Sequence, residues 1–221
     1  HNCHQSRIVY TIFLLVLFSF FLCSIATAET NYEKTGSYSG PNGIFDVTLD
    51  GRIIAINGDN ILREQTIGSG TYDIVGHFDP GLIAPWGASF ITVSPDGSRF
   101  AVGDNYFGQG KVHLVNISDL NGGTITPDSY NHENYDAVWM DNSILAITYA
   151  NLDNNYWGEV AALDLNSQKS TPLITIAGAS AGITFDTAGN LYTGNGFDYL
   201  PGGSETGQIR GFEKESIDRV M

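Results

Sequence analysis

The feature that most constrains the fold is a tight turn that recurs four times at nearly constant spacing. The turns fall at Asp50, Asp96, Asp141 and Ala188, so the intervals between them are 46, 45 and 47 residues. Short runs of apolar and β-branched residues stand on both sides of each turn, as in a β-hairpin. A chain with such a period is built from structurally similar units. The fold must therefore repeat one β-rich unit several times.

The stretch from Phe90 to Ile117 gives the clearest view of one unit. Strands are expected at 90–94, 99–102 and 111–117, with Pro95-Asp96-Gly97 as the first turn. A weaker fourth strand is expected at 123–127. Third strands open with a glycine at Gly110, Gly158 and Gly207, which are 48 and 49 residues apart. Four strands in a period in the mid-forties are typical of a β-propeller blade.

Composition supports an all-β protein, because charged residues are only 15% of the chain and Gly numbers 26. We predict a β-propeller with four-stranded blades of about 45 residues. The blades are expected at about 43–87, 88–134, 135–180 and 181–221, the last of them incomplete. Closed propellers have about four to eight blades. About three and a half blades therefore lead us to expect a fragment of a larger propeller.

Two segments resemble known propeller families. SPDGSRFAVGD, from Ser94, resembles the start of a blade in YVTN and WD40-like propellers, and AGITFDTAGNLYTGNG, from Ala181, is similar to the NHL and SMP-30-like pattern. The resemblance covers roughly residues 43–221 and implies a fold superfamily rather than an activity. No Trp-Asp pair closes the third strand, as it would in an ordinary WD40 repeat. No motif of the SMP-30 lactonases can be placed on single residues, so none of their site residues is carried over.

The first 28 residues read as a signal peptide. Arg7 is followed by an apolar run from Ile8 to Ile25, and Ala26-Thr27-Ala28 supplies a cleavage site. The alternative is an uncleaved N-terminal anchor, because the run is long for a signal peptide. We therefore expect export to the periplasm, the cell surface or the medium. Residues 29–42 are a polar lead-in segment, and both cysteines lie in the leader, so no disulfide or thiol chemistry is expected after it.

The formal net charge is −14, and every acidic residue lies after the leader. Such a chain repels phosphate groups, so neither nucleic acid nor an anionic lipid surface is an expected partner. No transmembrane span is expected in the mature chain. Protein or carbohydrate partners remain compatible with this charge.

The connections between second and third strands carry the candidate site. Each places Asp and Asn just after the second strand, and the last three add aromatic residues. These residue types suit Ca²⁺, a carbohydrate or another polar ligand. The alternative is that Asp, Asn and Gly are what tight turns use. The candidate rim consists of Asp59, Asn60, Asp104, Asn105, Tyr106, Asp153, Asn155, Tyr156, Trp157, Asn195, Asp198 and Tyr199.

Residues Asp153 to Asp164 partly match a calcium-binding loop. Asp153 and Asn155 stand at the first and third positions, and Asp164 replaces the closing glutamate. The flanking segments are expected to be strands rather than helices. Asp153 and Asn155 are therefore only weak candidates for metal ligands, and no cofactor is firmly implied.

Two further patterns are given a structural interpretation. Gly178 to Gly182 fits the G-x-S-x-G motif, but a strand rather than a helix is expected after Ser180, and no histidine follows His132. We interpret Ser180 as part of a small-residue crossing between blades. His113 is expected at an ordinary half-buried or edge position within a third strand. No catalytic residue is assigned.

The sequence thus favours an exported propeller that acts as a binding or interaction scaffold for a polar ligand, a glycan or a protein. The face that bears the second-to-third strand loops would be the ligand side. One alternative is a propeller enzyme, such as a lactonase, a lyase or a glycan-active hydrolase, with a metal at the channel mouth. The other is a purely structural cell-surface module.

Overall fold

The structure is a computed structural model, and it describes residues 43–79, 83, 87–104, 110–125, 132–154, 157–176, 179–197 and 207–221. The described part lies within one unit that spans residues 38–221. The predicted leader and lead-in segment, residues 1–42, lie outside it. Among the described residues, no helix has the length and apolar character needed to cross a membrane.

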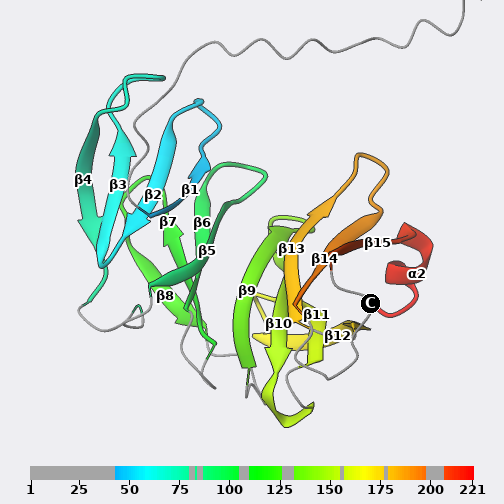
Figure 1. Cartoon of the computed structure of the whole chain (residues 1–221). Helices are drawn as coiled ribbons and strands as arrows, with labels where there is room; N and C mark the ends of the chain where they lie inside the picture. The colour runs from blue at the N-terminus through cyan, green and yellow to red at the C-terminus, as the bar shows by residue number, and fades with distance from the viewer. Residues whose placement is uncertain are drawn as a thin grey trace, which may run out of the picture. The chain divides into compact units, whose positions relative to one another are not determined.

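The described chain forms four antiparallel sheets, each built from strands that follow one another in the sequence (Figure 1). The first sheet contains β1 (Ile44–Val47), β2 (Ile53–Asn57), β3 (Asn60–Glu64) and β4 (Tyr72–His77). The second contains β5 (Ala88–Val93), β6 (Arg99–Asp104), β7 (Val112–Asn116) and β8 (Gly122–Ile125). The order within each sheet is the order along the chain, which is the topology of a propeller blade.

The third and fourth sheets continue the series. The third contains β9 (His132–Trp139), β10 (Ile144–Asn151), β11 (Trp157–Asp164) and β12 (Lys169–Ile176), with a 3₁₀ turn η1 (Leu152–Asn154) after β10. The fourth contains β13 (Ala179–Phe185), β14 (Leu191–Phe197) and β15 (Gln208–Phe212). A short helix α2 (Lys214–Asp218) follows β15, and the sequence did not predict it.

These four sheets confirm the predicted fold class and the four-stranded repeat. We call them blades 1 to 4. Blades 1 to 3 have four strands each, and three strands of blade 4 are described. Their first strands lie next to one another in series, because β1 contacts β5, β5 contacts β9, and β9 contacts β13. First strands are therefore the inner strands of the propeller.

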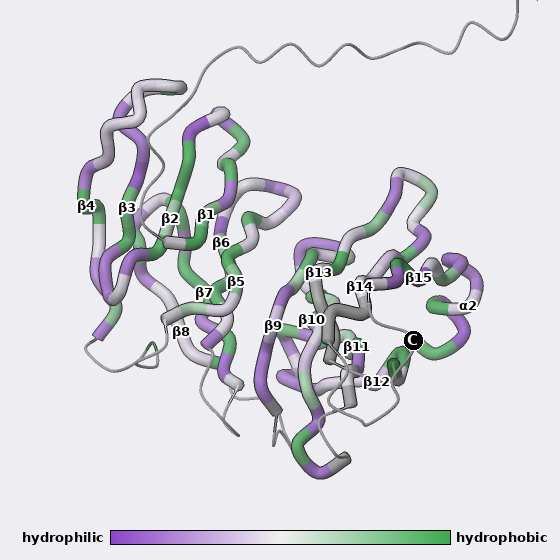
Figure 2. Tube along the Cα trace, viewed as in Figure 1, coloured by the Kyte–Doolittle hydropathy of each residue, from purple (hydrophilic) through white to green (hydrophobic). Residues whose placement is uncertain are grey.

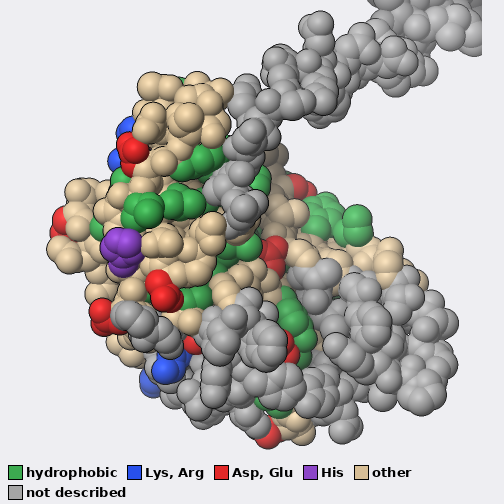
Figure 3. All heavy atoms as spheres, turned by 60° about the vertical axis from the view of Figure 1, so that its left-hand side comes forward, with side chains coloured by type: hydrophobic (Ala, Val, Ile, Leu, Met, Phe, Trp, Pro, Cys, Tyr) green, Lys and Arg blue, Asp and Glu red, His purple; other side chains and the backbone are tan. Residues whose placement is uncertain are grey.

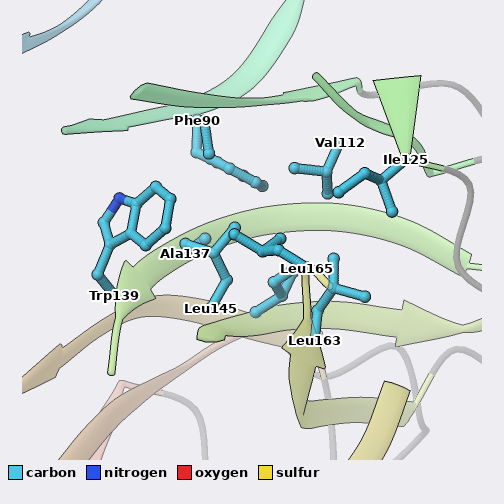
Figure 4. Close-up of a cluster of buried hydrophobic side chains, with 10 residues drawn as sticks. Phe90, Val112, Ile125, Ala137, Trp139, Leu145, Leu163 and Leu165 are labelled. Carbon is cyan, nitrogen blue, oxygen red and sulfur yellow. The ribbon is translucent and has the colours of Figure 1, made fainter. Parts of the chain in front are cut away.

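Neighbouring blades are held together by apolar side chains on their facing surfaces. Between blades 2 and 3, Phe90, Val112 and Ile125 point toward Ala137, Leu145 and other buried residues of blade 3 (Figure 4). Similar clusters join blades 1 and 2 and blades 3 and 4. Figure 2 shows hydrophobic residues running along β1, β2 and β5. Burial of one such side chain contributes about 1.5–3 kcal/mol, so these interfaces supply most of the cohesion between blades.

Hydrogen bonds between the inner strands of neighbouring blades supplement this apolar packing. The Val93 amide donates to Asp46 Oδ2 at 2.7 Å, and the Ile183 amide donates to Asp136 Oδ2 at 3.0 Å. Trp139 Nε1 donates to the Thr92 carbonyl at 3.1 Å. Each of these bonds joins residues 47 positions apart. They therefore link equivalent regions of successive blades.

Candidate functional site

The loops after the second strands all lie at one end of their sheets, which we call the loop end. The pairing partners show this, because Ile44 at the start of β1 lies opposite Ile56 near the end of β2. Ala88 and Asp104 are paired in the same way in blade 2, and His132 and Asn151 in blade 3. Inner strands therefore begin at the loop end, beside the loops in which the sequence placed a ligand rim.

In blade 1 the predicted rim is a tight hairpin turn. Asn57 pairs with Asn60, and Gly58 between them has a φ of +56°, a conformation that glycine adopts without strain. The backbone carbonyl of Asp59 accepts a hydrogen bond of 2.8 Å from the Phe78 amide. Asp59 and Asn60 are both half-buried. Turn chemistry accounts for these two residues.

In blades 2 and 3 the rim residues differ in exposure. Asp104 is the last residue of β6 and is only 4% exposed, which is unlike the open rim position that the sequence suggested. Asp153 is exposed on η1, where its amide donates to Asn151 Oδ1 at 3.0 Å. Trp157 begins β11 of blade 3, and in blade 4 Asn195 lies in β14. The remaining predicted rim residues, Asn105, Tyr106, Asn155, Tyr156, Asp198 and Tyr199, lie outside the described part of the chain.

The partial calcium loop does not close around one ion. Asp153 precedes β11, and Asp164 is the last residue of that eight-residue strand. At about 3.3 Å per residue the strand alone spans more than 20 Å, whereas calcium ligands lie about 2.3–2.6 Å from the ion. Asp164 instead accepts a hydrogen bond of 2.8 Å from the Asn166 amide, as a turn aspartate does. The prediction that Asp164 could close the loop was wrong.

Ser180 lies within β13 rather than in a crossing between blades. The strand continues to Phe185, so the strand-to-helix elbow that a nucleophilic serine needs is absent from this described segment, as expected. His113 is only 2% exposed, which is more buried than the sequence suggested, and its Nδ1 lies 3.0 Å from Thr124 Oγ1.

A polar group at the loop end of blade 3 was not found from the sequence. A β-bulge at Tyr135 shifts the pairing of β9, so that Asp136 faces Thr148 while Asn134 faces Tyr149. Side chains of directly opposed residues share one face of a sheet. The bulge therefore turns Asn134 to the face opposite that of Asp136. Without it, strict alternation would place both side chains on the same face.

Glu159 of β11 completes this group. It pairs with Tyr149 of β10, which pairs with Asn134 of β9 on its other side. Tyr149 Oη donates to Glu159 Oε2 at 2.8 Å, and Asn151 Nδ2 donates to Glu159 Oε1 at 3.0 Å. Tyr149 is 2% exposed and Glu159 is 9% exposed. Both carboxylate oxygens are thus satisfied although the group is withdrawn from water. We call Asn134, Tyr149, Asn151 and Glu159 the junction cluster.

The junction cluster faces blade 2. Asn134 Nδ2 donates to the Lys111 carbonyl at 3.3 Å, and Asn134 is fully buried. A Cβ atom on Gly110 would lie 2.9 Å from the Asn134 side chain, so this position requires glycine for close approach. Among the described residues, no group donates a hydrogen bond to the buried Asn134 Oδ1. A buried acceptor of this kind is stabilised by a hydrogen-bond donor.

The opposite face of β9 carries two carboxylates whose pKa values are shifted upward. Burial raises the pKa of Glu133 above its ordinary value. Burial also raises the pKa of Asp136, and the hydrogen bonds from the Ile183 and Ala137 amides offset part of this effect. Carboxyl groups with shifted pKa values are more frequent at functional sites than elsewhere in proteins. The first half of β9 therefore presents polar chemistry toward both neighbouring blades.

Chemically, this arrangement suits recognition of hydrogen-bond donors. The junction cluster offers a carboxylate and an amide oxygen, and both are acceptors. Calcium, hydroxyl groups and amines are the partners that such oxygens bind. No group of three or more His, Cys, Asp or Glu side chains within the described ranges is arranged to hold a metal ion.

Comparison with known proteins identifies the fold but no close relative. No protein-family model matches the chain, and no curated protein matches it in sequence. Among solved structures, TolB from Acinetobacter baumannii superimposes with a TM-score of 0.50 and 18% identity over 79% of this chain and 46% of its own. A candidate gluconolactonase gives a TM-score of 0.50 and 13% identity, covering 76% of this chain and 61% of its own.

The extracellular domain of a candidate one-component system from B. thetaiotaomicron gives a TM-score of 0.51 and 14% identity, covering 82% of this chain and 23% of that one. The chain thus spans less than two thirds of the length of these structures. TolB and the gluconolactonase have β-propeller-type folds. Together with the four successive sheets, these similarities show that this chain has a β-propeller-type repeat fold.

Proposed function

We propose that the chain is a binding scaffold that recognises a polar ligand at the loop end, with the junction cluster as the centre of the site. The observation that carries this proposal is the buried acceptor set formed by Asn134 and Glu159, which lies at the loop end of blade 3 where Asn134 contacts blade 2. A buried amide oxygen without a partner is costly, about 1–3 kcal/mol. A ligand that donates a hydrogen bond to it recovers that cost.

The chemistry of the cluster narrows the ligand class. Glu159 is held in place by Tyr149 and Asn151, so its carboxylate does not need to reorganise when a ligand arrives. The chain is strongly acidic, with a formal net charge of −14. Ligands that present hydroxyl groups, or Ca²⁺, are therefore favoured over phosphates and other anions. A glycan, free or attached to a protein, is the ligand that we favour.

The test is a thermal-shift and calorimetric screen of the chain against calcium and a glycan panel, followed by variants. Asn134→Ala and Glu159→Gln should weaken any binding found by about tenfold, because each removes one acceptor for a donor group. Asn134→Asp, which keeps the acceptor oxygen, should retain more binding than Asn134→Ala. Asn142→Ala is the control, because Asn142 contacts the Asp96 amide at the opposite end of the sheets. The proposal fails if Asn134→Ala and Glu159→Gln bind like the parent chain, or if Asn142→Ala weakens binding as much as they do.

An enzyme is the second candidate, and the raised pKa values of Glu133 and Asp136 favour it. A carboxyl group with a raised pKa holds its proton to higher pH than an ordinary carboxyl group does, and a group of this kind can act as a general acid in a lactonase, a lyase or a glycan-active hydrolase. A metal-dependent version would need further ligands from the loops. Turnover of a lactone or a glycan that Asp136→Asn abolishes would favour this candidate over a scaffold.

We also propose that the chain is exported after removal of residues 1–28. The proposal is supported by the apolar run at 8–25 and the cleavage site at 26–28. N-terminal sequencing of the secreted protein should find Glu29 as the first residue. An intact leader on membrane-associated protein would instead support the uncleaved anchor.

A further inference from the structure

A second candidate site lies between blades 1 and 2. A groove of about 350 Å³ separates the outer strands of blade 1 from β7 and β8 of blade 2. Its apolar floor is formed by Ile61, Phe78, Val115 and Leu120. Small-molecule pockets range from about 300 to 1,000 Å³, so the groove lies at the small end of that range. Its occupant must be small.

The polar side of the groove mixes hydrogen-bond donors and acceptors. It is formed by His77, Asp79, His113, Asn121 and Thr124. The His113 ring lies 5.8 Å from the Phe78 ring at a tilt of 58°, so the two blades meet through an aromatic contact beside the groove. Thr124 lies opposite His113 in the β7–β8 pair, and its hydroxyl holds the imidazole in place. The Thr124 hydroxyl and the buried His113 imidazole are thus held relative to each other, whereas His77, Asp79 and Asn121 are exposed at the groove.

The charge of the lining separates ligand classes. No lysine or arginine occurs among the described residues that line the groove, and Asp79 contributes a carboxylate. Anionic ligands are therefore disfavoured. An organic cation would use Asp79 but would leave the imidazole, amide and hydroxyl donors unmatched. Hydroxyl groups both donate and accept, so a neutral polyhydroxylated molecule can pair with the carboxylate, amide and hydroxyl groups of the lining alike.

Figure 3 brings the β4 side of blade 1 forward and shows histidine, acidic and hydrophobic side chains close together on this surface. We propose that the groove between blades 1 and 2 is a binding site for a neutral polyhydroxylated ligand of monosaccharide size. Its C–H surface would pack on the floor around Phe78, and its hydroxyl groups would face Asp79, Asn121 and Thr124. This site is separate from the junction cluster between blades 2 and 3.

The test is saturation-transfer NMR of the chain with glucose, galactose, mannose and fucose, and with tetramethylammonium as a cationic probe. At least one sugar should show transfer through its ring protons. Asp79→Asn should weaken binding about tenfold, and Thr124→Val about fivefold, because each removes part of the hydrogen bonding. Thr124→Trp should abolish binding by filling the groove. Thr66→Trp, at an exposed turn threonine outside the groove, is the matched control and should bind like the parent chain.

The outcomes are distinct. Sugar signals that persist in Thr124→Trp, transfer to tetramethylammonium but to no sugar, or an absence of transfer to all four sugars would each overturn the proposal. Glu159→Gln separates this site from the one at the junction cluster. Sugar binding that survives Glu159→Gln but not Thr124→Trp supports the groove, whatever becomes of the loop-end proposal. The reverse pattern would place the sugar at the junction cluster and overturn the groove proposal.

Discussion

The two ends of the sheets differ in how far they repeat. At the end that carries the first turns, each blade uses nearly the same chemistry. Asp96 accepts from the Ser94 hydroxyl at 2.7 Å and from the Ser98 amide at 2.9 Å, and Asp141 accepts from the Ser143 amide and hydroxyl. At the loop end the described parts of the blades share a bulge near the start of the first strand in blades 2, 3 and 4 but differ in their side chains. Blade 1 has a two-residue turn, blade 2 ends β6 with a buried aspartate, and blade 3 has the buried junction cluster.

This contrast distinguishes residues that every blade needs for folding from residues that a single blade can use for binding. A feature that recurs in every unit serves the fold, because every unit has to form the same hairpin. Features found in only one unit are free to serve a ligand. The two ends should therefore respond differently to substitution, with loss of stability at the first-turn end and loss of binding at the loop end.

Trp139→Ala should have the largest effect on stability. Trp139 is 7% exposed, packs in the core between blades 2 and 3, and carries the Arg99 guanidinium 5.5 Å from its ring. Truncation of such a side chain costs about 3–5 kcal/mol. Trp139→Phe keeps most of the packing and loses mainly the bond to the Thr92 carbonyl, so it should cost clearly less. Urea denaturation measures both, and equal losses would contradict the packing account.

Gly110→Ala should come next, with a loss of about 1–3 kcal/mol from overpacking against Asn134. Gly123→Ala is the matched control, because a Cβ there meets nothing within 4 Å. It should leave the free energy of unfolding nearly unchanged. Gly110→Ala should also weaken ligand binding at the junction cluster, which Gly123→Ala should not. Similar free energies of unfolding for both variants would show that the site next to Asn134 tolerates a Cβ atom at position 110.

The pH dependence of stability should have opposite signs at Asp96 and Asp136. Hydrogen bonds from the Ser94 hydroxyl, and then from the Ser98 amide and hydroxyl, lower the pKa of Asp96 to about 2. Its stabilisation is therefore lost as the pH falls from about 4 toward 2. Burial raises the pKa of Asp136, so the folded state penalises its charge and gains stability as the pH falls through the raised pKa.

Denaturation of the parent chain, Asp96→Asn and Asp136→Asn from neutral pH down to about pH 2 tests the two signs. The stability of the parent chain relative to Asp136→Asn should increase first, as the pH falls through the raised pKa of Asp136 toward about 4. The advantage of the parent chain over Asp96→Asn should then shrink as the pH falls from about 4 toward 2. Parallel curves for the two variants would show that the two carboxylates share one environment.

Asp153→Ala should have the smallest effect. Asp153 is exposed on a 3₁₀ turn, and substitutions at such positions change stability by about 0.5 kcal/mol or less. Any stabilisation by calcium should also be the same in Asp164→Ala as in the parent chain, because Asp164 lies at the far end of β11. A thermal-shift titration with calcium checks both variants.

The sequence predicted the repeat because turn chemistry is local. Asp96-Gly97 and its counterparts can be recognised without knowledge of tertiary contacts, and their spacing is enough to indicate blades. Gly110 and Gly158 were found in the same way, and the structure supplies the reason at Gly110, which is its approach to Asn134. The calcium loop failed because a spacing rule taken from a helix-flanked loop was applied to residues at opposite ends of a strand.

The junction cluster could not be found in this way. Asn134, Tyr149 and Glu159 lie in segments that read as ordinary strands, and their contact depends on a bulge at Tyr135. A bulge changes which face a residue occupies, and its position is decided by pairing with the neighbouring strand. Half of the predicted rim residues lie outside the described chain, so their role stays a prediction.

The bonds that join residues 47 positions apart have a consequence for how such a chain can change. Apolar faces alone allow one blade to slide over the next, whereas a carboxylate aimed at a single amide accepts only one offset. The hydrogen bonds of Asp46 and Asp136 therefore fix the register between neighbouring blades, and the hydrogen bond of Trp139 does the same where blade 3 meets blade 2. When a blade is duplicated, deleted or grafted, each new interface between blades must contain a hydrogen bond of this kind. Without it, the apolar faces can pack against each other in the wrong register.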